Sequence, residues 1–134
     1  MDEELELYQK NTIDRFSEDT VNRIIATADV DDMMAEIVEI LESSPSQMSY
    51  DIVPLPGKFY TFVYQPKTPR IEYDEYPLIA CVGLEKWGFR GLNYHWGSWR
   101  NYTWEEVVGY PYIIYPQEIK TLRSIPYQKK QLNI

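Results

Sequence analysis

The chain has 134 residues, of which 44% are apolar and 15% aromatic, with one cysteine and a formal net charge of −8. This length allows one domain with a small appendage, and a single cysteine excludes an intrachain disulfide or a cysteine zinc cluster. The N-terminus lacks the basic and apolar regions of a signal peptide, and no apolar run reaches the roughly 18 residues of a membrane helix. We therefore expect no membrane association.

Charge divides the chain into two parts. Residues 1–53 contain 14 acidic and 3 basic side chains, whereas residues 54–134 contain 7 acidic and 10 basic ones. Such asymmetry indicates different surroundings or partners for the two parts. A Ser- and Pro-rich stretch at 43–49 has the composition of a linker. We predict an acidic helical segment over residues 1–48 and a small β-barrel domain with a basic C-terminal tail over 49–134.

Helices are predicted throughout the acidic segment. A weak apolar stripe favours a helix over 3–15, and Ser17 is a suitable N-cap for a second helix over 18–27. The most regular pattern lies over 30–43, where apolar residues recur at the helical period. Helices this short cannot bury their apolar faces alone, so they must pack on the barrel, on a second copy or on another protein.

The second part of the chain has the composition of strands. Runs of β-branched and aromatic residues predict strands over 59–64, 76–82 and 89–96, with a last strand over 112–115. Between the last two, residues 97–102 are expected to leave the sheet. In the first strand, odd- and even-numbered side chains should face opposite sides.

Two further helical stretches and a loose tail complete the prediction. Thr103 and Glu106 have the spacing of a capping box, which predicts a short helix over 104–108. One or two helical turns are expected over 117–123. The residues from Pro126 onward are expected to be loosely held.

Helices come first and strands later, which predicts an α+β fold rather than alternating α/β units. We expect the N-terminal acidic helices to pack on a small antiparallel Src-homology-3-like β-barrel, with a short helix after the third strand. Gly88 and Gly91 should serve a positive φ, a bulge or a close backbone approach.

No residue set predicts catalysis, a cofactor or a metal. His95 is the only histidine, and no nucleophile or orienting group is fixed near it, so we interpret it as a packed or hydrogen-bonded residue. Cys81 lies in an apolar strand, where cysteine acts as a small hydrophobe. The acidic group Glu72, Asp74 and Glu75 matches no calcium loop and is interpreted as a solvated loop.

Basic and aromatic residues alternate in several parts of the second segment. This pattern can hold a nucleic-acid backbone while rings stack on bases, although ordinary surface charge is the competing interpretation. The candidate contact residues for nucleic acid or another partner are Lys67, Arg70, Arg90, Trp99, Arg100 and Tyr102. The candidate partner-docking surface on the acidic helix consists of Glu36, Glu39 and Glu42.

Three motifs occur in order within residues 56–95. They are Pro-Gly-Lys-Phe-Tyr-Thr-Phe-Val-Tyr at 56–64, Tyr-Asp-Glu-Tyr-Pro-Leu-Ile at 73–79 and Gly-Phe-Arg-Gly-Leu-Asn-Tyr-His at 88–95. This stretch of about 40 residues resembles a small β-barrel module of tailed-bacteriophage proteins, in T-even-like phages and cyanophages, some of them labelled DNA end protector. The acidic N-terminus and the segment 96–102 depart from the module's pattern.

The resemblance implies a phage origin and a role in the virion or at its DNA. The expected function is a non-enzymatic binding protein of the host cytoplasm or virion, acting in assembly or in protection of packaged DNA. Its barrel would form the contact surface and its acidic helices would dock a protein partner, with DNA and a second copy as further candidate partners. The alternative is an early phage protein that inhibits a host nucleic-acid-binding factor by acidic mimicry.

Overall fold

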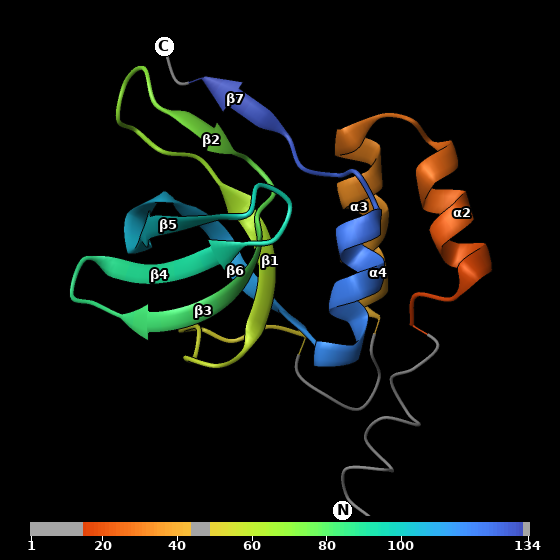
Figure 1. The fold of residues 1–134 in the computed structure, drawn as a ribbon, viewed down its shortest axis with the longest axis horizontal. Coiled ribbons are helices and arrows are strands. Elements are labelled where there is room, and N and C mark those ends of the chain that lie inside the picture. Colours follow the sequence, from red (N-terminus) through yellow and green to blue (C-terminus); the bar gives the residue numbers. More distant parts are fainter. Residues whose placement is uncertain (1–14, 44–48, 133–134) are drawn as a thin grey trace, which may run out of the picture.

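A computed structural model describes residues 15–43 and 49–132 as an α+β fold (Figure 1). The helices are α2 (Glu18–Ala26), α3 (Val30–Glu42) and α4 (Ile119–Ser124), with 3-10 turns η1 (Trp104–Glu106) and η2 (Pro116–Glu118). The strands are β1 (Phe59–Tyr64), β2 (Glu72–Asp74), β3 (Leu78–Leu84), β4 (Gly88–Asn93), β5 (Ser98–Thr103), β6 (Val107–Ile114) and β7 (Lys130–Leu132). The predicted fold class is confirmed.

Five strands form one antiparallel sheet in the order β5-β4-β3-β1-β6, and β2 pairs with β7 in a separate two-stranded sheet. The predicted barrel is corrected in one respect: the sheet does not close on itself, because β5 and β6 are its two edges in the described part of the chain. The outer edge of β6 is already occupied. Ile113 N–H donates to Ser49 O, and Asp51 N–H donates to Pro111 O.

Alternate residues of β1 face two separate clusters, as predicted. Tyr60, Phe62 and Tyr64 join the cluster enclosed by the curved sheet, whose other buried members are Ile79, Cys81, Phe89 and Tyr102. Phe62 lies edge-on to Tyr102, with the ring centroids 5.2 Å apart. Edge-to-face pairs stabilise a core beyond their area of burial. Many of the chain's aromatic residues therefore serve to fill this cluster.

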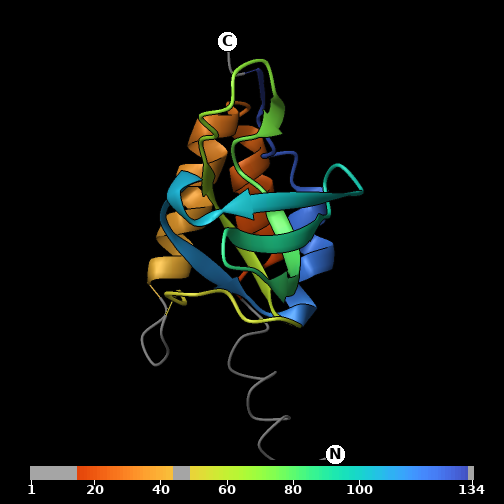
Figure 2. The same cartoon turned by 90° about the vertical axis from the view of Figure 1, so that its left-hand side faces the viewer.

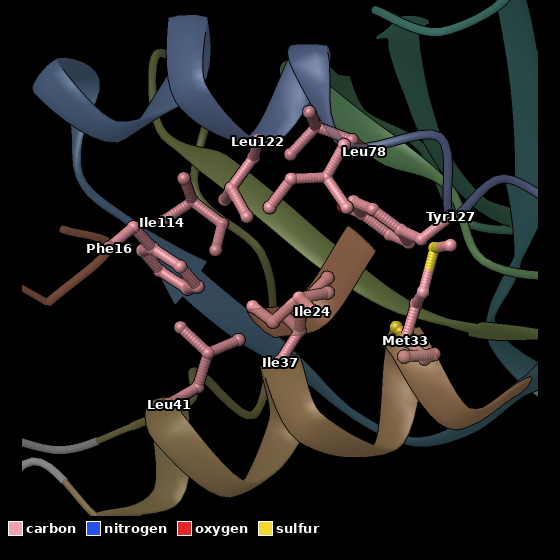
Figure 3. Packing of buried hydrophobic residues seen from close by; sticks show 11 residues of the cluster. Phe16, Ile24, Met33, Ile37, Leu41, Leu78, Ile114, Leu122 and Tyr127 are labelled. Carbon is pink, nitrogen blue, oxygen red and sulfur yellow. The ribbon is translucent and has the colours of Figure 1, made fainter. Parts of the chain in front are cut away.

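The opposite face of the sheet is covered by helices (Figure 3). Ile24 of α2 and Ile37 and Leu41 of α3 are fully buried against Leu78 and Ile114 of the sheet. Burying side chains of this size stabilises a fold by about 1.5–3 kcal/mol each. The question of what covers the apolar helix faces is thus resolved, because the sheet and α4 of the same chain cover them.

The start of α2 follows the predicted capping chemistry, and α3 is capped in a similar way by Asp29. The Ser17 hydroxyl accepts a hydrogen bond from Thr20 N–H at 3.3 Å, and the Asp29 carboxylate accepts one from Asp31 N–H at 2.8 Å. The weak helix predicted over 3–15 falls almost entirely on residues 1–14, and most of the predicted linker falls on 44–48, both outside the described residues. Helices and sheet share one cluster, and the domain division near residue 48 stays a prediction.

Two predictions about the later chain are wrong. The third strand ends at Asn93, and the chain then turns back as β5, so residues 98–102 of the stretch expected to leave the sheet belong to it. The tail is held, because Tyr127 is fully buried and β7 pairs with β2. β5 becomes a strand through pairing with the neighbouring β4, and the tail is held by partners distant in the sequence; local composition reveals neither.

The predicted capping box is also corrected. Residues 104–106 form a 3-10 turn in which Thr103 makes no side-chain cap, and its hydroxyl donates to the Glu106 carboxylate instead. The last strand is longer than expected, since β6 begins at Val107. The helical turns predicted over 117–123 are confirmed by η2 and α4.

Close backbone approach explains the two glycines of β4. A Cβ at position 88 would lie 1.8 Å from Tyr102 O, and one at position 91 would lie 2.7 Å from Cδ1 of Ile79. Side chains at these positions would separate β4 from β5 or displace the enclosed cluster. Of the three explanations offered by the sequence, close approach is therefore confirmed.

The packing of α3 predicts a specific loss of stability. Ile37→Ala should lower the free energy of unfolding by about 2–5 kcal/mol, because it leaves a cavity between α3 and the sheet. Ile25→Ala, on a helix residue that is 40% exposed, is the matched control and should change it by less than about 0.5 kcal/mol. Urea unfolding of both variants measures the difference; equal losses would contradict the packing described.

Candidate functional site

Three of the six predicted contact residues converge on one hollow. It lies over β3, β4 and β5, has a volume of about 700 Å³ and is lined by Val82, Gly83, Glu85, Arg90, Trp99, Arg100 and Asn101. Strand register explains two of the three residues. Arg90 pairs with Asn101 and Leu92 pairs with Trp99, so Arg90 and Trp99 lie on the same face of adjacent strands. Arg100 pairs with Gly91, is out of phase with them and lines the hollow from its rim. We call this hollow the contact surface.

The helices leave this part of the sheet open. Figure 2 shows the strands in front and the helices behind them. Trp99 is 66% exposed and is the natural anchor for an incoming ring or apolar group. Two arginines and one glutamate line the hollow, so its local charge is positive although the whole chain is acidic.

Arg100 is held in place at the rim. Its guanidinium donates to Glu72 O at 2.6 Å and lies over the Trp96 ring, 5.0 Å from the centroid. The bond to Glu72 joins β5 to β2, so Arg100 also borders a second cleft between these strands. That cleft has a volume of about 260 Å³ and is lined by Tyr64, Ile71, Tyr73, Asp74, Trp99, Arg100, Asn101 and Tyr102. Trp99 and Arg100 therefore link the two hollows.

The other three predicted contact residues do not line the contact surface. Lys67 and Arg70 lie exposed in the loop between β1 and β2, where Lys67 N–H donates to the Glu106 carboxylate. Tyr102 is only 3% exposed and stacks on Phe89 at a centroid distance of 5.4 Å. Tyr102 therefore supports the contact surface from beneath, and its predicted contact role stays a prediction.

The three glutamates of α3 have different surroundings. Glu36 and Glu39 border a groove of about 320 Å³, together with Arg23, Ile40 and Ser43. One carboxylate oxygen of Glu36 is buried, and Glu42 accepts a hydrogen bond from the Tyr112 hydroxyl at 2.6 Å. Glu39 is exposed. The structure thus places them on one helix but gives Glu42 a role within the fold.

A buried carboxylate fixes the hairpin that carries the contact surface. Asp74 accepts hydrogen bonds from the Asn93 side chain and from the N–H groups of Tyr76 and Lys129, each at 3.0 Å. Burial raises the pKa of Asp74, and these bonds oppose the rise. The solvated-loop interpretation of the acidic group is therefore wrong at Asp74. The only local sign of this network in the sequence is Asn93, because asparagine is favoured at the start of a tight turn.

His95 belongs to the same region and is hydrogen-bonded, as predicted. Its Nε2 lies 3.2 Å from Leu122 O and 3.1 Å from Ile125 O, and its ring is edge-on to Tyr127 at 4.8 Å. Two carbonyl acceptors require that Nε2 carries the proton. The other ring nitrogen, Nδ1, is buried without a hydrogen-bond partner. Burial lowers the pKa of His95, and the residue joins the β4–β5 turn to the end of α4.

Cys81 is buried in the enclosed cluster, and burial raises the pKa of its thiol. The interpretation as a small hydrophobe is confirmed.

Across residues 15–43 and 49–132, no group of three or more His, Cys, Asp or Glu side chains could hold a metal ion. No helix within these ranges is long and apolar enough to span a bilayer. No family model, curated protein or solved structure matches the chain.

The Asp74–Asn93 pair predicts an asymmetric mutant cycle. Asp74→Asn should lower the free energy of unfolding by about 1–3 kcal/mol, because in either orientation the new amide turns its NH2 group toward at least one of the three donors. Asn93→Asp should also destabilise, because it places two carboxylates together. The double variant Asp74→Asn/Asn93→Asp restores a donor facing an acceptor, so it should be more stable than either single variant. Urea unfolding tests this, and additive losses would contradict the pairing.

His95 predicts a measurable pH dependence. Its folded-state pKa lies below the usual 6.5, so its contribution to stability is complete above pH 6.5 and is lost as pH falls through the folded-state pKa. As the only histidine, it gives a single NMR ring titration, whose midpoint should lie below 6.5. His95→Gln should remove the corresponding part of the pH dependence of unfolding. A midpoint at or above 6.5 would contradict the buried neutral ring.

Proposed function

We propose that this chain is a non-enzymatic bacteriophage binding protein, associated with the virion or its DNA, whose sheet carries the contact surface. The observation that carries the proposal is the convergence of Arg90, Trp99 and Arg100 on one open hollow. These residues are distant from the acidic helices, which cover the other part of the sheet. Arginine and tryptophan are enriched at binding surfaces.

The strand arrangement supports the Src-homology-3-like assignment. Five antiparallel strands follow one another with a 3-10 turn before the last, and that last strand returns to pair with the first. Register shifts at Thr61/Val63 and Cys81/Gly83 mark the points where the sheet bends. Together with the motifs at 56–95, this arrangement favours the phage module over an unrelated five-stranded sheet.

The acidic helices are proposed as the docking element for a protein partner. Their apolar faces are used within the fold, so docking would involve the outward polar face, where Glu39 is exposed beside Glu36. The alternative, inhibition of a host nucleic-acid-binding factor by acidic mimicry, would use the same face. The exposed Glu39 is the specific feature in its favour.

Mass spectrometry of purified phage particles tests the proposal. The protein should be present in virions, and the double charge reversal Arg90→Glu/Arg100→Glu should reduce its incorporation at least about tenfold by removing the positive charge of the contact surface. Lys120→Glu, on the exposed side of α4, is the matched control and should have no effect.

Absence of the wild-type protein from particles would exclude the virion role. Salt-sensitive capture of one host nucleic-acid-binding protein, abolished by Glu39→Lys but unaffected by the arginine reversals, would instead support mimicry. Glu39 is the better position for this variant than Glu42, because Glu42 contacts Tyr112.

A further inference from the structure

A further groove lies outside the contact surface and is mainly apolar. It has a volume of about 340 Å³ and is lined by Ile52, Val53, Pro54, Phe89, Trp104, Val107, Gly109, Tyr110 and Pro111. One wall is the segment 52–54 and the other contains Trp104 of η1. Sequence patterns gave no indication of this groove, because its walls come from three separate parts of the chain.

The groove is preformed. The Trp104 Nε1–H donates to Lys86 O at 2.9 Å, and its ring lies 5.5 Å from that of Phe89 in the enclosed cluster. Tyr110 is stacked on Tyr50, with the ring centroids 4.5 Å apart. These contacts fix the aromatic walls, so filling the groove would cost little ordering of side chains.

An exposed isoleucine forms part of one wall of the groove. Ile52 is 72% exposed, more than any other large hydrophobic residue in the described ranges. An apolar protrusion and an apolar hollow on the same patch are self-complementary under a twofold axis, because in such an interface the same patch meets itself. The groove is large enough for a branched aliphatic side chain.

Each wall of the groove has charged neighbours of both signs. Asp51, which precedes Ile52, lies 3.7 Å from Lys58. Beside Trp104 on the opposite wall are Lys86 and Glu105, both exposed and neither in an ion pair with another described residue. In a twofold arrangement that inserted Ile52 into the partner copy's groove, each wall would face the opposite wall of the other copy, and Lys58 would approach Glu105 of the second copy.

We propose that this groove is a self-association surface: two copies of the chain pair about a twofold axis, and Ile52 of each copy fills the groove of the other. The groove and the contact surface over β3, β4 and β5 lie on the same sheet, but they have no lining residue in common. A dimer would thus display two contact surfaces, which raises the apparent affinity for a repeated target.

Sedimentation equilibrium over micromolar concentrations tests the proposal. The wild-type chain should show a reversible monomer–dimer equilibrium. Ile52→Asp should weaken it on the order of 100-fold, because two buried isoleucines are lost per dimer. Ile25→Asp, an exposed isoleucine of α2, is the matched control and should leave it unchanged. Circular dichroism should give the same melting temperature for the Ile52→Asp monomer as for wild-type monomer.

A charge exchange separates this twofold arrangement from other contacts. Lys58→Glu and Glu105→Lys should each weaken self-association roughly tenfold by placing like charges together. An equimolar mixture of the two variants should recover wild-type affinity, because both cross-copy pairs are then opposite in sign. A monomeric wild-type chain, equal weakening by Ile25→Asp, or a mixture no tighter than the single variants would each overturn the proposal.

Discussion

The hydrogen bond between Asp74 and Asn93 is the constraint on which the arrangement of the strands depends. A buried carboxylate is costly unless donors surround it, and here three donors come from three segments. Asn93 belongs to the β4–β5 hairpin, Tyr76 precedes β3, and Lys129 leads into β7. The cost of burying Asp74 is offset only when all three segments are in place, so this residue makes their assembly cooperative.

The same network positions the contact surface. Asn93 uses its side-chain oxygen to accept the N–H groups of His95 and Trp96, both at 2.9 Å, which fixes the turn after β4. The turn places Trp96 under the guanidinium of Arg100. Arg100 in turn reaches back to β2, the strand that contains Asp74. The hairpin and β2 are thus joined at both ends, and Trp99 projects from a rigid support.

Residue patterns predicted the helices and strands whose formation is determined by neighbouring residues in the sequence. The helical period identified α3, and alternation identified β1, because each reflects burial of one face by the element itself. They did not predict β5, whose Trp99, Arg100 and Asn101 are polar or exposed, since only pairing with β4 makes it a strand. The tail was missed for a related reason. Gln128, Lys129 and Lys130 look like a solvated end, and their order comes from Tyr127 and from contacts with Asp74.

The candidate site was predicted in part for the same physical reason. Composition identified basic and aromatic residues, but register decides which of them share a face. Arg90 and Trp99 meet because β4 and β5 are adjacent, whereas Tyr102, one step out of phase with Asn101, points into the enclosed cluster. Glu85 and Asn101 joined the surface although neither has a distinctive motif. Candidate contact residues identified from the sequence therefore define a surface only when it is known which face of each strand they occupy.

The division of charge along the sequence is partly used inside the molecule. Asp31 of α3 lies 2.9 Å from Lys129 of the basic tail, and Glu42 bonds Tyr112 of β6. Asp31 also accepts the Tyr76 hydroxyl, which with Lys129 holds the pKa of this carboxyl below its usual range. Attraction between the two halves thus helps to attach the helices to the sheet. What remains for partners is smaller than the net charge implies, and it includes the exposed Glu39 on one side and Arg90 with Arg100 on the other.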